Sequence, residues 1–365
     1  MLDSNEAIPG HPAPTGRKPS TAAPASEYCR AFHQNRWLLR SLLGGAYLDG
    51  DKGELPVARP TLSLATHALR DEIVLVGLRL RRPLSDTTVY DRINSEVVKA
   101  IDFYGKRGWL ARPEGFFAQP PAPTDVKIRS FGRGGNRRHE RLSFDSGYAP
   151  YAKEPGRQRW LSYTGNRREY ALMLRHSEPR PWLVCVHGTE MGRVNLDLTL
   201  FRAWHLHEAF GLNVVLPVLP MHGPRAKGLP KGAVFPPGED VMDDVHATAQ
   251  AVWDIRRVLA WIRLQQPGAK IGVNGISLGG YISALVASLD EDLTCAILGV
   301  PPANLVSILG RHAGLSIDDP PRHRTLELAE PIGGEMISPL SLQPKVAPPQ
   351  PVHLRRRRRP DRAPA

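Results

Sequence analysis

The feature that most constrains the fold is a strand-like run followed at once by glycines, a serine and a helix. Residues 269–274 (AKIGVN) have the pattern of a short buried strand, residues 275–279 are Gly-Ile-Ser-Leu-Gly, and residues 278–288 have the apolar spacing of a helix. So sharp a turn needs glycines where side chains would collide. The pattern predicts that Ser277 is raised above the end of a sheet strand, at a helix N-terminus.

Strand-like and helix-like segments alternate around this turn. Two early hairpin strands come first and strand–helix alternation follows, which predicts an α/β fold with a mostly parallel sheet and helices on both faces. Asp240 is the expected N-cap of the longest helix. We expect strands at 125–131, 140–145, 168–175, 182–187, 213–219, 269–274 and 295–300, and helices at 31–43, 62–80, 87–105, 196–210, 240–265 and 278–288.

Two further segments complete a recognisable set. The run VCVHGTEMGR at 184–193 ends a strand on His187 and Gly188, and LPVLPMHGPR at 216–225 joins the next strand to a loop. With the Gly-Ile-Ser-Leu-Gly turn and the early hairpin, these segments resemble the α/β-hydrolase superfamily of esterases and lipases over roughly residues 125–305. The resemblance implies the α/β-hydrolase fold.

The resemblance also implies a chemistry and the residues that perform it. The superfamily transfers acyl groups through a Ser-His-Asp/Glu triad, with no cofactor and no metal. Ser277 would be the nucleophile, and the backbone N–H groups of Thr189 and Leu278 would form the oxyanion hole. The His187 side chain is interpreted as structural. In the loop at 220–225, His222 or Arg225 would contact substrate; a Pro/Gly-shaped loop with a solvated arginine is the alternative.

The sequence after the last predicted strand departs from this pattern. Five consecutive arginines at 355–359 cannot form a buried strand, because unpaired charges are costly to bury. The hydrolase fold is therefore expected to be incomplete after its sixth strand, with an exposed sheet edge and a tendency to associate. A reading-frame change or a fragment boundary is the hypothesis that would explain the shift in composition.

The acid and base of the triad are correspondingly hard to identify. His323, Asp318 and Asp319 are the candidates, and each also reads as a surface loop residue. Pro320 and Pro321 are expected to block a helix in the stretch that joins Asp318 and Asp319 to His323. A serine without a base is a weak nucleophile, so the chain could bear the motif and hydrolyse little.

Composition sets the remaining expectations. The net charge is +12, of which six Arg and one Asp in residues 355–365 supply +5. No aromatic residues interleave with the arginines, so no nucleic acid is expected. Three cysteines, no signal-peptide pattern and no apolar run of membrane length favour a cytoplasmic protein. The predicted organisation is a disordered tail at 1–26, a helical region at 27–112, a Pro-rich linker at 113–124, the incomplete hydrolase domain at 125–345 and a Pro/Arg-rich tail at 346–365.

Three hypotheses about function follow. The first is a serine hydrolase of the esterase or lipase type that acts on a small-molecule ester or acyl substrate. The second is a non-catalytic binding or scaffold protein with the same fold. The third is a binder of nucleic acid or membrane surfaces through the basic tail, which predicts steep salt dependence.

Overall fold

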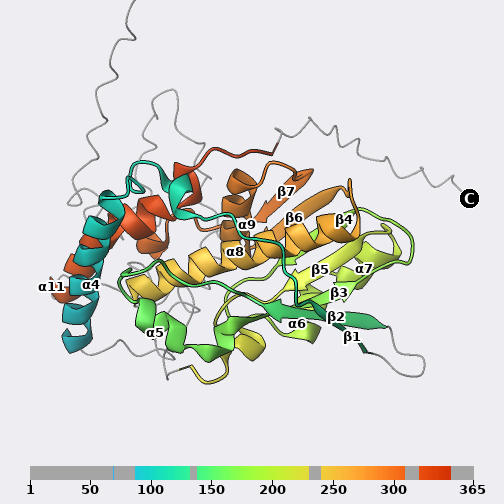
Figure 1. The fold of residues 1–365 in the computed structure, drawn as a ribbon, viewed down its shortest axis with the longest axis horizontal. Coiled ribbons are helices and arrows are strands. Elements are labelled where there is room, and N and C mark those ends of the chain that lie inside the picture. The colour runs from blue at the N-terminus through green and yellow to red at the C-terminus, as the bar shows by residue number, and fades with distance from the viewer. Residues whose placement is uncertain (1–68, 70–86, 132–137, 230–239, 309–319, 347–365) are drawn as a thin grey trace, which may run out of the picture. The chain divides into compact units, whose positions relative to one another are not determined.

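A computed structural model describes Leu69 and residues 87–131, 138–229, 240–308 and 320–346 (Figure 1). The chain divides into two units, Met1–Ile73 and Val74–Ala365, and every helix and strand given below lies in the second. The helix expected at 31–43, all of that expected at 62–80 except Leu69, and the Arg-rich tail lie outside the described residues. No helix among the described residues is both long enough and apolar enough to cross a membrane.

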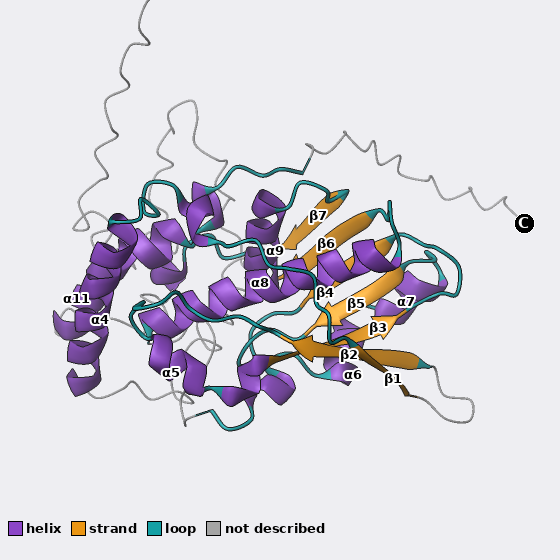
Figure 2. Cartoon of the chain, viewed as in Figure 1, coloured by secondary structure: helices purple, strands orange, loops and turns teal. Residues whose placement is uncertain are grey.

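A seven-stranded mixed sheet forms the centre of the described structure (Figure 2). Its order is β1-β2-β3-β5-β4-β6-β7. The first three strands run antiparallel to their neighbours, and β5, β4, β6 and β7 run parallel to one another. The strands are β1 Lys127–Phe131, β2 His139–Asp145, β3 Arg168–Leu174, β4 Trp182–Val186, β5 Asn213–Pro217, β6 Ile271–Ile276 and β7 Cys295–Gly299. The predicted early hairpin strands and the parallel strands that follow them are confirmed, in a sheet with three antiparallel and three parallel strand pairs.

Helices cover both faces of this sheet because successive strand residues point to opposite sides. On β4, Val184 and Val186 join the core that lies beneath α8 (Val241–Gln265) and α9 (Leu278–Leu289). Leu183 and Cys185 join a second core, formed with α6 (Val194–Leu200) and α7 (Ala203–Glu208). The central strands are therefore buried on both faces. The 240–265 helix is confirmed, and Asp240 caps it by accepting a hydrogen bond from the Asp243 N–H at 3.1 Å.

One helix that was predicted to be continuous is interrupted in the structure. The segment expected to be a single helix at 196–210 is two short helices, α6 and α7, separated at Phe201 and Arg202. Arg202 lies in the left-handed region, at φ 49°, and this ends the first helix and redirects the chain. The apolar spacing continues across the break, which is why the sequence pattern does not reveal it.

Helix α4 (Thr87–Gly105) has the predicted bounds and packs against α8 and α11 (Pro320–Ala329). Its buried residues Ile93, Val97 and Tyr104 belong to the same core as α8 and α9. Shorter elements complete the described chain: η1 Pro113–Phe116, α5 Arg157–Ser162, η2 Thr164–Arg167, η3 Gly223–Ala226, η4 Glu330–Met336 and η5 Pro339–Ser341.

The expectation that Pro320 and Pro321 would block a helix before His323 is also wrong. The two prolines are the first residues of α11, and His323 lies in that helix. Proline is tolerated in the first helical turn, where the backbone N–H groups have no partner within the helix.

Candidate active site

Ser277 occupies the turn between β6 and α9. Its backbone lies at φ 54° and ψ −120°, and the residue is exposed. A Cβ added at Gly275 would lie 2.1 Å from the Gly279 carbonyl oxygen, and one added at Gly279 would lie 1.9 Å from that of Val186. Both glycines are therefore required by backbone collisions, and they permit a turn that presents the serine to solvent.

The turn is held by one hydrogen bond to the neighbouring strand β7 and by one from helix α9. The Ser277 N–H donates to the Gly299 carbonyl at the end of β7, at 2.8 Å, and the Tyr281 N–H donates to the Ser277 carbonyl at 3.0 Å. Leu278 is the first residue of α9 and has a buried side chain. Its N–H has no acceptor within the helix, as is usual for the first helical residues.

The His187–Gly188 turn, which follows β4, lies directly against Ser277. A Cβ built on Gly188 would be 3.3 Å from the Ile276 carbonyl oxygen and 3.4 Å from the Ser277 Cβ. Thr189, the next residue, is half-buried. The chain thus brings Ser277, Leu278 and the Gly188–Thr189 peptide to one place.

His187 is fully enclosed and has a defined role in this turn. The Leu219 N–H donates to its Nε2 at 3.0 Å, so Nδ1 carries the proton and donates to the Gly188 carbonyl at 2.8 Å. Burial, reinforced by the neighbouring His222, lowers the pKa of His187 to about 3. The imidazole is therefore neutral at physiological pH.

Residues 218–226, here called the rim loop, follow β5 and contact the His187–Gly188 turn. Met221 is buried with φ 64°. His222 is also buried, and its ring centroid lies 5.0 Å from that of His187. A Cβ on Gly223 would be 2.2 Å from the Gly192 carbonyl oxygen, so the backbones of the two loops are in direct contact.

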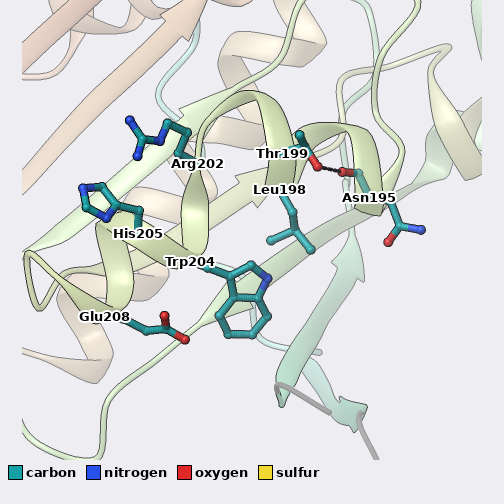
Figure 3. Close-up of a pocket in the computed structure, with 7 residues that line it drawn as sticks. All are labelled: Asn195, Leu198, Thr199, Arg202, Trp204, His205 and Glu208. Carbon is teal, nitrogen blue, oxygen red and sulfur yellow. Dashed lines mark hydrogen bonds between the residues drawn. The ribbon is translucent and has the colours of Figure 1, made fainter.

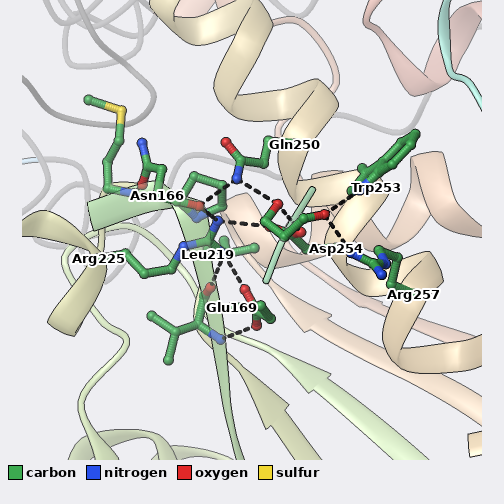
Figure 4. Close-up of polar contacts among 12 residues, drawn as sticks. Asn166, Glu169, Leu219, Arg225, Gln250, Trp253, Asp254 and Arg257 are labelled. Atoms are coloured by element: carbon green, nitrogen blue, oxygen red, sulfur yellow. Dashed lines mark hydrogen bonds and ion pairs between the residues drawn. The ribbon is translucent and has the colours of Figure 1, made fainter. Parts of the chain in front are cut away.

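Arg225 does not lie where the sequence placed it. Its side chain is 0% exposed and forms ion pairs with Glu169 on β3 and with Asp254 on α8, the latter at 2.8 Å (Figure 4). It also donates to the backbone carbonyls of Val218 at 2.9 Å and Asn166 at 3.0 Å. These bonds hold the guanidinium group in the protein interior. The expected substrate contact is replaced by an anchor for the rim loop.

The carboxylates that hold Arg225 are equally buried. Burial raises the pKa of both Glu169 and Asp254, and the Arg225 charge opposes that shift. Ser146 donates to Asp254 at 2.6 Å, and the Val218 N–H donates to Glu169 at 3.2 Å. Sequence reasoning missed this network. An acid within a strand-like run and another in the middle of an apolar helix were the available signals.

Among the candidate acids and base, only His323 lies within the described residues. It lies on α11, which packs against α4, and Asp318 and Asp319 lie outside the described residues. Within the described ranges no hydrogen bond involves the Ser277 Oγ. The Ser277 turn and the Gly188–Thr189 peptide thus lie side by side, and the roles of nucleophile, oxyanion donors and base stay predictions.

A separate hollow of about 490 Å³ lies along α6 and α7 (Figure 3). None of the predicted site residues lines it. Arg202, at the break between the two helices, is part of its wall. The lining residues are Asn195, Leu198, Thr199, Arg202, Trp204, His205 and Glu208.

The chain is similar to two curated proteins of Mycobacterium tuberculosis, one from strain CDC 1551 / Oshkosh and one from strain H37Rv, each described as an uncharacterized protein. Each is 64% identical over 303 residues, which cover 83% of this chain and 72% of the relative. No family model matches the chain.

Among solved structures, acetyl xylan esterase 1 from Thermoanaerobacterium sp. is 15% identical with a TM-score of 0.42, covering 66% of this chain and 74% of its own. The acetyl xylan esterase from Paenibacillus sp. R4 is 15% identical with a TM-score of 0.37, covering 60% and 72%. Likenesses of this size carry no argument about activity.

Proposed function

The chain belongs to the family of the two mycobacterial relatives and has the α/β-hydrolase fold, and on that premise we propose that it is a serine hydrolase of the esterase type. Ser277 is the nucleophile, and a small-molecule ester is the substrate. The observation that carries the proposal is the exposed Ser277, in a sharp turn of positive φ at a helix N-terminus, packed against the Gly188 turn.

The reaction follows from these positions. The Ser277 Oγ attacks the ester carbonyl carbon, and the carbonyl oxygen becomes negatively charged. The N–H groups of Leu278 and Thr189 are the proposed donors to that oxygen. The alcohol then leaves with a proton, and an acyl-serine remains. Water attacks the acyl-serine, releases the carboxylic acid and regenerates the Ser277 hydroxyl.

A base must accept the Ser277 proton during the attack. His323, with Asp318 or Asp319 as its partner, remains the candidate set from the sequence. If the chain has no base, the oxyanion donors alone would leave only a residual rate. The measured rate therefore reports directly on whether the triad is complete.

A fluorophosphonate probe tests the proposal, because an activated serine displaces fluoride from phosphorus and keeps the label. We expect the full chain to be labelled, Ser277→Ala to lose the label, and Ser162→Ala, which changes another exposed serine, to retain it. Labelling that persists in Ser277→Ala would disprove the assignment. If the chain is labelled, alanine variants of the three histidines that follow Ser277 in the sequence, His312, His323 and His353, would then identify the base.

The second candidate is a non-catalytic binding protein that uses the same turn. The position of His323 on α11, against α4 rather than at Ser277, is the observation that favours it. It predicts a folded chain that is not labelled by the probe.

A further inference from the structure

We propose that His187 is a positioning residue, which aims the backbone N–H of Thr189 at the oxygen of the reacting ester by fixing the peptide that joins Gly188 to Thr189. The inference rests on the proposed function only in giving that N–H its role as an oxyanion donor. It departs from the sequence interpretation, in which the imidazole had a structural role and only the backbone was assigned to catalysis.

The argument begins with the planarity of the peptide bond. The Gly188 carbonyl and the Thr189 N–H belong to one trans peptide unit, so they point in opposite directions and rotate together. His187 Nδ1 donates to the Gly188 carbonyl oxygen at 2.8 Å. A bond that fixes the carbonyl therefore fixes the direction of the N–H on the other side of the same plane.

The second ring nitrogen determines which nitrogen carries the proton. The Leu219 N–H donates to Nε2 at 3.0 Å, so Nε2 must be the acceptor and Nδ1 the donor. Only the neutral ring with this tautomer satisfies both contacts. A proton on Nε2 would face the Leu219 N–H and break the arrangement.

The rim loop holds Leu219 in place for this contact. Arg225 binds the Val218 carbonyl at 2.9 Å, one residue before Leu219, and is itself held by Glu169 and Asp254. The Asn166 side chain accepts from the Met221 N–H at 2.8 Å on the other side. A continuous path of hydrogen bonds thus runs from the buried ion pairs to the peptide beside Ser277.

The surroundings leave the ring little freedom to adopt another orientation. His187 is 1% exposed, and a Cβ on Gly192 would lie 3.1 Å from its Nε2. The His222 ring packs edge to face against it. The ring therefore acts as a rigid spacer between the rim loop and the Gly188 carbonyl.

Asparagine and glutamine separate the two contacts. The side-chain nitrogen of Asn can take the place of Nδ1, and the side-chain oxygen of Gln can take the place of Nε2. His187→Asn should keep the donor to the Gly188 carbonyl, and His187→Gln should keep only the acceptor for the Leu219 N–H. Each variant retains one of the two hydrogen bonds, so their thermal stabilities should be alike.

The test measures hydrolysis of p-nitrophenyl acetate and inhibition by a trifluoromethyl ketone, which forms an oxyanion on Ser277. We expect His187→Gln to lose about 100-fold in kcat and in affinity for the ketone, with KM little changed, because one oxyanion donor is misdirected. His187→Asn should stay within about threefold of the parent chain. Equal losses in the two variants would overturn the inference.

A crystal structure of each variant decides the matter independently of activity. The Gly188 carbonyl should keep its direction in His187→Asn and turn away in His187→Gln; an unchanged carbonyl in both would overturn the inference. If the parent chain hydrolyses nothing and is not labelled by the fluorophosphonate probe, the proposed function fails, and the positioning of this peptide is judged on the carbonyl direction alone.

Discussion

Strands β5 and β7 are both five residues long, apolar and parallel to a neighbour, yet their surroundings are opposite. Every residue of β5 is buried, whereas on β7 Ile297 is 51% exposed and Leu298 40%. The Ser277 turn lies between these two environments, since its glycines touch β4 on one side and its N–H bonds to the end of β7 on the other. One side of the site is thus enclosed by packing, and the other is supported by a strand with little cover.

Loss of the Arg225 charge should produce the largest difference between the two sides. Arg225→Met leaves two buried carboxylates without their cation, and we expect a loss of about 3–5 kcal/mol in the free energy of unfolding. Urea denaturation measures it. Arg175→Met, which removes the exposed partner of Glu140, is the matched control and should cost less than about 1 kcal/mol. Similar losses in both variants would contradict the buried-anchor interpretation.

Glycine-to-alanine substitutions compare the β4 and β7 sides directly at the Ser277 turn. Gly279→Ala would place a Cβ 1.9 Å from the Val186 carbonyl oxygen, on the enclosed side, whereas at Gly299, on the β7 side, the nearest atom is 3.4 Å away. We expect Gly279→Ala to cost about 3 kcal/mol because rigid backbone must move, and Gly299→Ala to cost much less. Thermal unfolding of both variants checks this. A Gly299→Ala variant as unstable as Gly279→Ala would show that β7 is no looser than β4.

Two acidic residues should contribute to stability with opposite dependence on pH. Burial raises the pKa of Glu154 to about 7, although its carboxylate accepts bonds from the Tyr104 hydroxyl and the Tyr151 N–H, both at 2.6 Å. The folded state therefore holds a proton that the unfolded state has already released. The contribution of Glu154 to stability should fall by roughly 3 kcal/mol as the pH rises from the ordinary glutamate pKa to about 7.

Glu291, beyond α9 on the β7 side, supplies the comparison. Its hydrogen bond to the Lys345 ammonium lowers its pKa, so its contribution is present at neutral pH and is lost as the pH falls. Unfolding of the parent chain and of both variants is measured from pH 4 to 8. The stability of the parent chain relative to Glu154→Gln should fall as the pH rises, and its stability relative to Glu291→Gln should rise. A difference from Glu154→Gln that does not change with pH would contradict the raised pKa of Glu154.

The smallest effect on stability is expected at the exposed strand. Ile297→Lys places a charge where the side chain is already half in water, so the free energy of unfolding should change by less than about 0.5 kcal/mol. The charge should reduce association, because it interrupts an uncharged apolar edge. Light scattering of the parent chain and of Ile297→Lys checks this. A parent chain that is already monodisperse would contradict the expectation that this edge promotes association.

The sequence was sufficient for what depends on local pattern. The strand, glycines and helix around Ser277 are close in the chain, and their periodicities predict the turn. The Arg225 network could not be predicted, because Glu169, Arg225 and Asp254 come from three distant segments that only the tertiary fold brings together. The break at Arg202 was missed because apolar spacing reports which face is buried and carries no information about a single left-handed residue.

The glycines around Ser277 have a consequence for how related sequences are compared. Gly275 and Gly279 are required because a methyl group at either position would overlap backbone atoms. A relative with any other residue at position 277 would still be selected to keep both, simply to fold. Conserved glycines in an alignment of this family would therefore be evidence of shared packing at this turn and would carry no information about chemistry.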